Sequence, residues 1–341
     1  MSTEPCRSPG NSKKGPIFVV GAPRTGTTLT MEILNNHSLV HLYNEVHYNE
    51  RIADLIPCEE PLDPENLQKS AETLLAKSPW KHGGNDPASD LADLVTKARK
   101  LGGTHGAVLE AFLGAESAAS GKIIWGDSSP QDVLYLDRLK DWYPDARFVG
   151  VVRDPRAYLA SYKNYYRKQL KSYRNRFNPL ANCLLWRSYM RALLAAKSGL
   201  FGASVHLLHY EDLVSHPEIE IRKLSEFLDL PYEETMHAVG RQNSSYIPVA
   251  EDSKNTGINA GSRDRWNTEL TGAEIWLTQK IAGRELIELG YSPVPVTFRR
   301  EEFWSDIRTL NAMPGRVFNL LFRTGKPFTL AKLKRVLGKS R

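Results

Sequence analysis

A short glycine-containing segment near the start of the chain has the residue types that bind an anionic group. It lies between an apolar run at residues 16–20 and an apolar-periodic run at 29–34, and it reads Gly21-Ala22-Pro23-Arg24-Thr25-Gly26-Thr27-Thr28. This order predicts a strand, a tight loop and a helix. Such a turn directs successive backbone N–H groups and the positive end of a helix at one point, so we expect it to hold a phosphate or sulfate group.

The spacing of this segment is that of a P-loop with one residue changed. Where a P-loop for nucleoside triphosphates has Lys, this chain has Thr27. The hydroxyls of Thr27 and Thr28 could instead cap the following helix, but that role explains neither the glycines nor Arg24. The sequence therefore predicts a phosphate-binding loop that lacks the usual lysine.

A second candidate anion site follows an apolar run at residues 148–152. The chain continues Arg153-Asp154-Pro155-Arg156, and Pro155 suits the first turn of a helix because its missing N–H costs nothing there. Ser161 comes about two helical turns later, so Arg153 and Ser161 can face one anion if the helix packs over the strand end. The alternative is a surface Arg–Asp pair beside a structural serine.

Apolar runs alternate with helical patterns along the chain, which is typical of an α/β fold with a mostly parallel sheet. The candidate strands are 17–20, 40–43, 123–125, 148–152 and 205–209. Between the second and third, residues 51–121 contain helical patterns at 65–77 and 89–101. We expect an inserted helical cap there, because ligands bind beyond the carboxyl ends of parallel strands and an insertion at that edge shapes a substrate pocket.

Composition indicates one large globular domain. Of the 341 residues, 41% are hydrophobic and 25% are charged, and both values are ordinary for such a domain. The three cysteines are far apart in the sequence and support neither a disulfide framework nor a zinc cluster. No apolar run approaches the roughly 20 residues that cross a bilayer, and residues 1–14 lack the apolar centre of a signal peptide. We therefore expect a cytoplasmic location.

Basic residues are concentrated at the C-terminal end. Residues 296–341 hold eleven Lys or Arg and three Asp or Glu, a balance of +8, whereas the whole chain has a net charge of +6. The mixture of apolar and basic residues at 318–341 fits either a peripheral membrane contact or a solvated surface helix. No nucleic-acid recognition motif accompanies it, so nucleic acid is not an expected partner. We expect a disordered lead-in at 1–15, a main domain at 16–295 and a basic helical extension at 296–341.

Together, the two anion-binding segments resemble the sulfotransferase family that uses 3′-phosphoadenosine-5′-phosphosulfate (PAPS). The resemblance implies a three-layer α/β fold like that of P-loop kinases. In that family the Pro-Arg-Ser/Thr-Gly-Thr-Thr loop binds the 5′-phosphosulfate, and the Arg-Asp-Pro strand end with a serine eight residues on binds the 3′-phosphate. The residues implied for the first role are Pro23, Arg24, Thr25, Gly26, Thr27 and Thr28, and those for the second are Arg153 and Ser161.

Further matches to the family are spread over most of the chain. They are 125–130 (Trp-Gly-Asp-Ser-Ser-Pro), 210–213 (Tyr-Glu-Asp-Leu), 227–228 (Phe-Leu), 265–266 (Arg-Trp) with Leu270, and 290–291 (Gly-Tyr). The resemblance implies that Tyr210 contacts the nucleotide, although ordinary aromatic packing would explain it equally. Arg265 stands at the position of a cofactor-binding lysine, and Arg263 is a second candidate for the 3′-phosphate. The alternative is that 253–266 is a flexible surface loop.

A catalytic base is expected just beyond the second strand. An acceptor hydroxyl must lose its proton, and both Glu45 and His47 follow residues 40–43. The Pro-Arg loop resembles the branch of tyrosylprotein and glycan sulfotransferases, which uses a glutamate here, so we assign Glu45. The alternatives are His47 as the base, or a solvated Glu45 carboxylate without a role. Ser128 stands where related enzymes often carry Lys. Three alternatives follow: Arg24 carries more of the electrostatic role, another Lys or Arg from the cap reaches in, or turnover is slow.

The resemblance predicts an enzyme of the EC 2.8.2 type that uses PAPS as co-substrate and no metal ion. It would move the sulfuryl group to a hydroxyl of a small-molecule, glycan or lipid acceptor by in-line transfer. The absence of the P-loop lysine fits, because a sulfuryl donor carries less charge at the transferring end than a triphosphate. The alternatives are a P-loop small-molecule kinase and a non-catalytic nucleotide-binding adaptor. The acceptor and the oligomeric state do not follow from the sequence.

Overall fold

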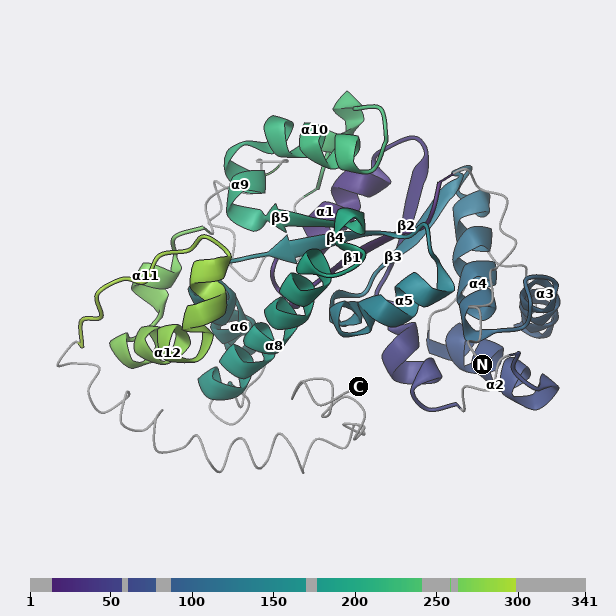
Figure 1. The fold of residues 1–341 in the computed structure, drawn as a ribbon, viewed down its shortest axis with the longest axis horizontal. Coiled ribbons are helices and arrows are strands. Elements are labelled where there is room, and N and C mark those ends of the chain that lie inside the picture. Colours follow the sequence, from purple (N-terminus) through teal and green to yellow (C-terminus); the bar gives the residue numbers. More distant parts are fainter. Residues whose placement is uncertain are drawn as a thin grey trace.

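The computed structural model describes residues 14–56, 61–77, 87–169, 177–240, 258 and 263–298 (Figure 1). Most of the predicted lead-in and the basic extension beyond residue 298 lie outside the described residues, as does most of the predicted loop at 253–266. None of the helices in the described ranges is long and apolar enough to span a membrane.

Five parallel strands form the central sheet. They are β1 (Ile17–Gly21), β2 (Val40–Asn44), β3 (Ile124–Ser128), β4 (Arg147–Val152) and β5 (Val205–His209). Their order in the sheet is β2-β3-β1-β4-β5, and every neighbouring pair is parallel. The predicted α/β fold with a parallel sheet is therefore confirmed. The strands β1, β2 and β4 are each one residue longer than predicted. The largest difference is in β3, which starts after Ile123, a residue that is 68% exposed, and extends to Ser128.

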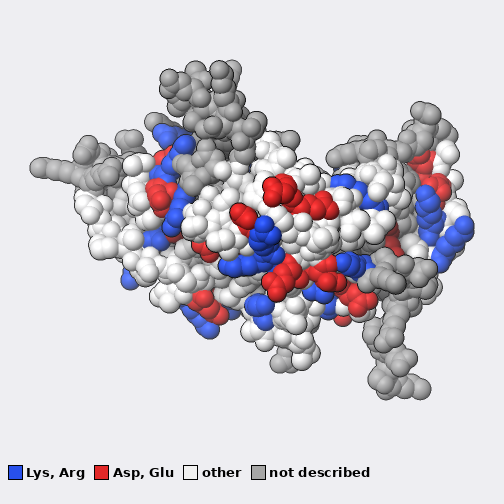
Figure 2. Space-filling model, turned by 90° about the horizontal axis from the view of Figure 1, so that it is seen from above, with Lys and Arg blue, Asp and Glu red and all other residues white. Residues whose placement is uncertain are grey.

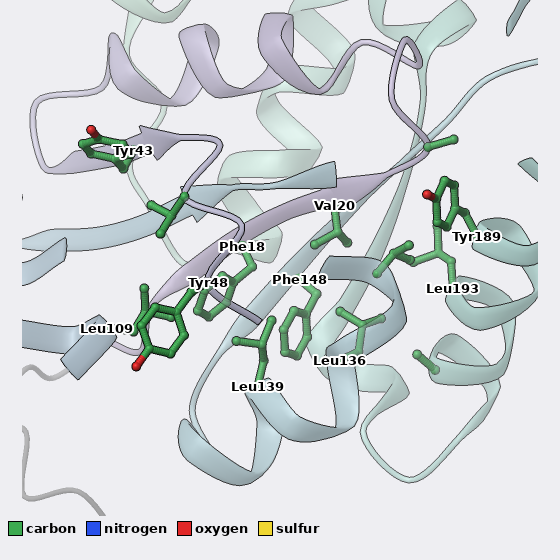
Figure 3. Packing of buried hydrophobic residues seen from close by; sticks show 14 of the residues in the cluster. Phe18, Val20, Tyr43, Tyr48, Leu109, Leu136, Leu139, Phe148, Tyr189 and Leu193 are labelled. Atoms are coloured by element: carbon green, nitrogen blue, oxygen red, sulfur yellow. The ribbon is translucent and has the colours of Figure 1, made fainter. Parts of the chain in front are cut away.

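The sheet is the middle layer of three. Alternate residues of a strand point to opposite faces, and both faces of β1 are buried. Ile17 and Val19 belong to a cluster that includes α1 (Thr27–Asn35) and α10 (Pro217–Phe227). Phe18 and Val20 belong to a second cluster that includes α5 (Leu136–Trp142) and α8 (Pro179–Ser198). Figure 3 shows this second cluster, in which the Phe18 ring stacks on Phe148 at 5.8 Å between centroids.

The remaining helices complete the two outer layers and their connections. They are α2 (Pro64–Lys77), α3 (Pro87–Lys100), α4 (His105–Ala119), α6 (Pro155–Gln169), α9 (Tyr210–Ser215), α11 (Trp266–Glu269) and α12 (Gly272–Glu288), with short 3-10 or π turns at Asn49–Ala53, Pro130–Tyr135, Gly202–Ser204 and Glu234–His237.

The insertion between β2 and β3 is helical, as its sequence pattern indicates. It contains α2, α3 and α4 at the β2 side of the sheet (Figure 1). Thr104 caps α4, because its hydroxyl accepts the N–H of Ala107 at 3.0 Å. Helix α4 packs on β2 and β3, and α2 and α3 pack on α4 through buried residues such as Leu74 and Leu94. The predicted helices within 51–121 are thus present at nearly the predicted bounds.

The last described helix, α12, returns the chain to the sheet. Thr271 and Glu274 form a capping box at its start, in which each side chain bonds the other residue's backbone N–H. The helix packs on α8 and α6. Trp266, which precedes it, is thereby brought against Arg156 at the start of α6.

The surface over α10 carries charges of both signs. Figure 2, which looks down on this side of Figure 1, shows Lys and Arg next to Asp and Glu. On α10 itself Arg222 pairs with Glu218 at 2.9 Å and Lys223 with Glu220 at 2.7 Å. The described residues of α10 therefore present positive and negative side chains side by side.

Candidate active site

The functional side chains predicted from the sequence meet at one edge of the sheet. In a parallel sheet every carboxyl end lies at the same edge, so the strand order becomes the order of the residues. Across the sheet these are Glu45 after β2, the end of β3 at 127–129, the loop 22–26 after β1, Arg153 after β4 and Tyr210 after β5. Helices α1 and α6 then leave the adjacent strands β1 and β4 on opposite faces, which opens the crevice where ligands of such sheets bind.

The loop after β1 presents the start of α1 without a side-chain cap. Gly26 is the N-cap residue at φ 109°, and as a glycine it has no side chain to cap the first-turn amides. Thr27 and Thr28 are already helical, so the N-cap explanation for their hydroxyls is wrong. Because the amides of a first turn have no acceptor inside the helix, they are available to an anion.

Thr25 has a different position from the other loop threonines. Its side chain is fully buried, and its hydroxyl donates to the carbonyl of Ala22 at 2.6 Å. Its backbone N–H donates to the same carbonyl at 3.2 Å. The hydroxyl of Thr25 therefore closes the loop on itself, whereas Thr27 and Thr28 lie on the first turn.

Contacts among four residues join the two predicted anion sites. The Arg153 guanidinium lies 4.3 Å from the centre of the Tyr210 ring, and its Nη1 donates to the carbonyl of Arg24 at 3.1 Å. The same Tyr210 ring lies against Gly26, so closely that an added Cβ would come within 2.5 Å of it. The loop after β1 and the end of β4 therefore form one positively charged cradle.

The corner between β4 and α6 is fixed by ion pairs and a ring contact. Arg156 binds the Asp154 carboxylate through Nε at 2.9 Å and Nη2 at 2.6 Å, and its guanidinium lies 4.2 Å from the centre of the Trp266 ring. The Asp154 N–H donates to Glu211 at 3.0 Å, and the Tyr291 hydroxyl donates to the other Glu211 oxygen at 2.7 Å. The Asp154 carboxylate is thus engaged inside the protein.

The other predicted cofactor residues lie around this corner. Ser161 is buried on α6, on the helix that follows Arg153. Arg265 directly precedes α11 and is partly buried. Arg263 is exposed and donates to the hydroxyl of Ser215, at the end of α9, at 3.1 Å. Arg263 thus lies nearer the exposed rim, on the side of β5.

Helix α6 places tyrosines next to Arg24. The Arg24 guanidinium lies 5.3 Å from the centre of the Tyr165 ring, and Tyr165 packs edge-on against Tyr166 at 5.6 Å. Burial raises the pKa of Tyr162, while the positive charge of Arg24 opposes that increase. A partly exposed aromatic face therefore borders the loop arginine.

Glu45 and His47 lie together with opposite exposures. The Glu45 side chain is 53% exposed and that of His47 is 7% exposed, and Glu45 Oε2 lies 3.4 Å from His47 Nε2. This hydrogen bond with His47 holds the pKa of Glu45 below its usual value, with help from the charges of Arg51 and Arg24 and against the effect of partial burial. Of the two candidate bases, Glu45 has the more exposed side chain.

Three successive amides attach the Glu45 loop to the end of β3. The N–H of Glu45 donates to the carbonyl of Ser128 at 3.2 Å, and that of Val46 to the Asp127 carboxylate at 3.3 Å. The N–H of His47 donates to the Ser129 hydroxyl at 2.8 Å. Burial raises the pKa of Asp127 to about 6, although hydrogen bonds from Ser129 and from the Val46 N–H oppose the increase.

The buried carboxyl of Asp127 predicts a pH-dependent stability difference. Its folded pKa is raised, so its stabilising effect is complete below about pH 3.8 and is lost as the pH rises through about 6. That difference in pKa corresponds to about 3 kcal/mol. Between pH 4 and pH 8 we expect the free energy of unfolding of wild type to fall by about that amount relative to Asp127→Asn, as measured by urea titration. Parallel curves for wild type and Asp127→Asn would contradict the assignment.

The comparison with known proteins decides the family. The family model described as "Sulfotransferase family" matches residues 16–234. The chain belongs to the sulfotransferase family. The match confirms the family predicted from the two anion-binding segments, and with it a transferase whose sulfuryl donor is PAPS.

Individual relatives agree with this family. Protein-tyrosine sulfotransferase 1 of Homo sapiens is 24% identical over 303 residues, which cover 81% of this chain and 70% of that protein. An uncharacterized protein of Aquifex aeolicus is 26% identical over 268 residues, 75% of this chain but 31% of that longer protein. The sulfotransferase domain of the curacin biosynthetic pathway has the same fold, with a TM-score of 0.53 at 19% identity, over 82% of this chain and 99% of that domain.

Several residues to which the sequence interpretation gave no individual role lie beside the predicted site residues. Tyr165 borders Arg24, and Asp127 and Ser129 hold the loop of Glu45. Glu211 fixes the backbone after Arg153. One sequence signal was available, since Asp127, Ser128 and Ser129 are polar residues at the end of an apolar strand. No local signal joins Tyr165 to Arg24.

Proposed function

We propose that this sulfotransferase transfers the sulfuryl group of PAPS to an acceptor hydroxyl, with Glu45 as the base and Arg24 as the principal cation. The observation that carries the proposal is the order of groups along one sheet edge. The exposed carboxylate of Glu45, the loop with Arg24 and the cradle with Arg153 follow one another there. A base, a cation and an anion cradle in this order suit in-line transfer between a hydroxyl and a bound anion.

The residues of the cradle fit a donor that carries anionic groups at two places. The amides of Gly26, Thr27 and Thr28 at the start of α1 suit the 5′-phosphosulfate, with Arg24 beside them. Arg153 and Ser161 suit the 3′-phosphate, and Tyr210 offers a ring for the nucleotide. The capless helix start supports this fit, because amides without a side-chain cap need an acceptor. Pro23, Thr25, Arg263 and Arg265 complete the proposed cofactor set.

The proposed chemistry needs one proton acceptor and one stabilised leaving group. PAPS supplies a sulfuryl group on a good leaving group. Glu45 takes the proton of the acceptor hydroxyl, whose oxygen forms the new S–O bond while the S–O bond to the 5′-phosphate breaks. Arg24 and the first-turn amides of α1 stabilise the negative charge that develops on the leaving oxygen. Ser128 has no positive charge, so Arg24 is the side chain that stabilises the leaving oxygen.

The acceptor is proposed to lie against the tyrosines of α6. Tyr165 and Tyr162 border Arg24, and an aromatic face of this kind accepts either a sugar ring or an aromatic ring. The relatives named protein-tyrosine sulfotransferases add a tyrosine hydroxyl to the small-molecule, glycan and lipid acceptors expected from the sequence. A screen for PAP (adenosine 3′,5′-bisphosphate) release from PAPS should use p-nitrophenol, cellobiose, galactosylceramide and a tyrosine-containing peptide.

Two residues disfavour the kinase alternative. Thr27 stands in place of the P-loop lysine, and the Asp154 carboxylate is bound by Arg156 instead of being offered to Mg²⁺. The adaptor alternative would retain the cradle without transfer activity. The proposed cytoplasmic location and the membrane contact of the basic extension are separate predictions, which fractionation and vesicle binding would test.

The ligand that stabilises the folded state distinguishes these functions. PAP at a hundredfold excess over its Kd should raise the melting temperature by roughly 5 °C, because it adds about 2.7 kcal/mol to the native state. MgATP at the same concentration should have a much smaller effect, since the cradle offers neither a lysine nor a metal ligand. Differential scanning fluorimetry measures both. Preference for MgATP would overturn the proposal, and stabilisation by PAP without any PAP release in the acceptor screen would favour the adaptor.

A further inference from the structure

His47 has a geometry that a passive neighbour of Glu45 does not need. Both residues have left-handed backbone conformations, with φ 61° at Glu45 and φ 54° at His47. Such conformations cost of order 1 to 3 kcal/mol each for residues other than glycine, and they persist only where the surroundings enforce them. Here three hydrogen bonds, from the backbone N–H groups of residues 45–47 to residues 127–129, enforce these conformations. The result is a loop that turns Glu45 outward and His47 inward.

The two nitrogens of His47 have different surroundings. Nε2 lies 3.4 Å from Glu45 Oε2. Nδ1 is buried and has no hydrogen-bond partner among the described residues. A buried N–H at Nδ1 would lack an acceptor, so the tautomer that fits has its proton on Nε2, where it can be donated to Glu45.

The charges around Glu45 explain why such a donor is useful. The Glu45 carboxylate lies within electrostatic reach of Arg51 from the following turn and of Arg24 from the loop after β1. Without a fixed donor, an exposed carboxylate between two guanidinium groups can form an ion pair with either. A pair with Arg24 would occupy the base and the proposed catalytic cation together.

We propose that His47 is a positioning residue that holds the Glu45 carboxylate toward the acceptor hydroxyl and away from Arg24. This inference rests on the proposed function, in which Glu45 is the base. His47 acts through Glu45 and does not itself touch the acceptor, because its ring is buried behind the carboxylate.

The test compares two substitutions that differ by one methylene group. Asparagine tolerates the left-handed conformation but is too short to reach Glu45, whereas glutamine places an N–H near the position of Nε2. His47→Asn should lower turnover roughly 10- to 100-fold with an unchanged Kd for PAP, since a misplaced group reacts poorly. His47→Gln should restore most of the rate. An unchanged melting-temperature increase with PAP shows that both variants fold.

The pH profile and a double mutant give readouts that a purely structural role would not change. Removal of the His47 donor should raise the pKa of Glu45, so the acid limb of kcat/KM moves to higher pH in His47→Asn and stays in place in His47→Gln. Charged groups that remain around Glu45 are Arg51 and Arg24, and the Asp127 carboxylate, which accepts the N–H of Val46, also interacts with His47. In a Glu45→Gln background, His47→Asn should lower turnover hardly any further, because the carboxylate that His47 positions is absent.

The outcomes separate this inference from the proposed function. Wild-type turnover and an unmoved acid limb in His47→Asn, with Glu45→Gln inactive, would overturn the positioning role and leave the base in place. If His47→Asn lowered turnover in the Glu45→Gln background by the same factor as in wild type, the positioning role would also be overturned, because His47 would then act independently of Glu45. Near-normal turnover of Glu45→Gln itself would instead remove the base assignment on which the inference rests.

Discussion

Glu45→Gln is expected to lower turnover by a factor of about 10² to 10⁴ while the Kd for PAP stays unchanged, which is the range that general base catalysis supplies. Glutamine keeps the size and the hydrogen-bonding oxygen of the side chain but cannot take the acceptor proton. The half-exposed carboxylate stands beside the end of β3 and away from the anion cradle at Arg153 and Tyr210. The rate of PAP release with the best acceptor of the screen measures turnover, and fluorimetry with PAP measures cofactor binding.

A second carboxylate in the same segment provides the control. Glu50 lies five residues further on, in the π-helical turn Asn49–Ala53, and it is partly exposed. Glu50→Gln removes the same charge from the same side of the sheet and should change turnover by less than about threefold, in keeping with the small effect of losing one partly exposed charge. Near-wild-type turnover of Glu45→Gln would place the base elsewhere. Equal losses in both variants would attribute the effect to the electrostatic potential of the region instead of to a proton transfer.

Gly26→Ala is expected to weaken PAP binding by a factor of about 100 or more. A Cβ at this position would lie 2.5 Å from the Tyr210 ring, and φ 109° is a conformation that residues with side chains rarely adopt. The ring cannot move away freely, because the Arg153 guanidinium lies over it. Relief of the clash must therefore shift the first turn of α1, the Tyr210 ring or Arg153, each of which belongs to the proposed donor site. Isothermal titration with PAP measures the loss.

Gly283→Ala is the matched control for this substitution. Gly283 lies inside α12, and an added Cβ there would meet no atom within 4 Å. Alanine in a helix interior is favoured over glycine by about 0.5 to 1 kcal/mol, so this variant should be slightly more stable and bind PAP like wild type. If Gly26→Ala bound PAP normally, the loop after β1 would not be the donor site. A general loss of folding in Gly26→Ala would show as a lower melting temperature without ligand, and Tyr210→Ala in the Gly26→Ala background should then restore folding.

Much of the fold was predictable because its signals are local. Each of the five strands is a short apolar run, and each predicted run lies in or next to an observed strand. The glycines at 21 and 26 locate a loop between β1 and α1, and Pro155 locates the start of α6. The shifted start of β3, after Ile123, has a physical cause, because an apolar side chain next to a strand can still be exposed. Local patterns of this kind depend on burial and backbone conformation, which neighbouring residues largely decide.

The residues of the candidate site were predictable from the sequence, but their relative positions and orientations were not. The sequence placed Thr25 with Thr27 and Thr28, but folding turns the Thr25 hydroxyl to the Ala22 carbonyl. The sequence also left Glu45 and His47 as alternatives, and only the tertiary structure shows that Glu45 is exposed and His47 is buried. Such distinctions depend on which way a side chain points, and a residue type does not contain that information.

The sequence by itself determined the family, the parallel strands and the two anion-binding segments, because a glycine loop before a helix and an Arg-Asp-Pro strand end are contiguous in the chain. The tertiary structure alone decided that Arg153 lies over the Tyr210 ring, that Gly26 lies beneath the same ring, and that the end of β3 holds the loop of Glu45. These contacts join residues dozens of positions apart. They arise because parallel strands bring all their carboxyl ends to one edge, in an order that the crossover connections set and the sequence of residues does not.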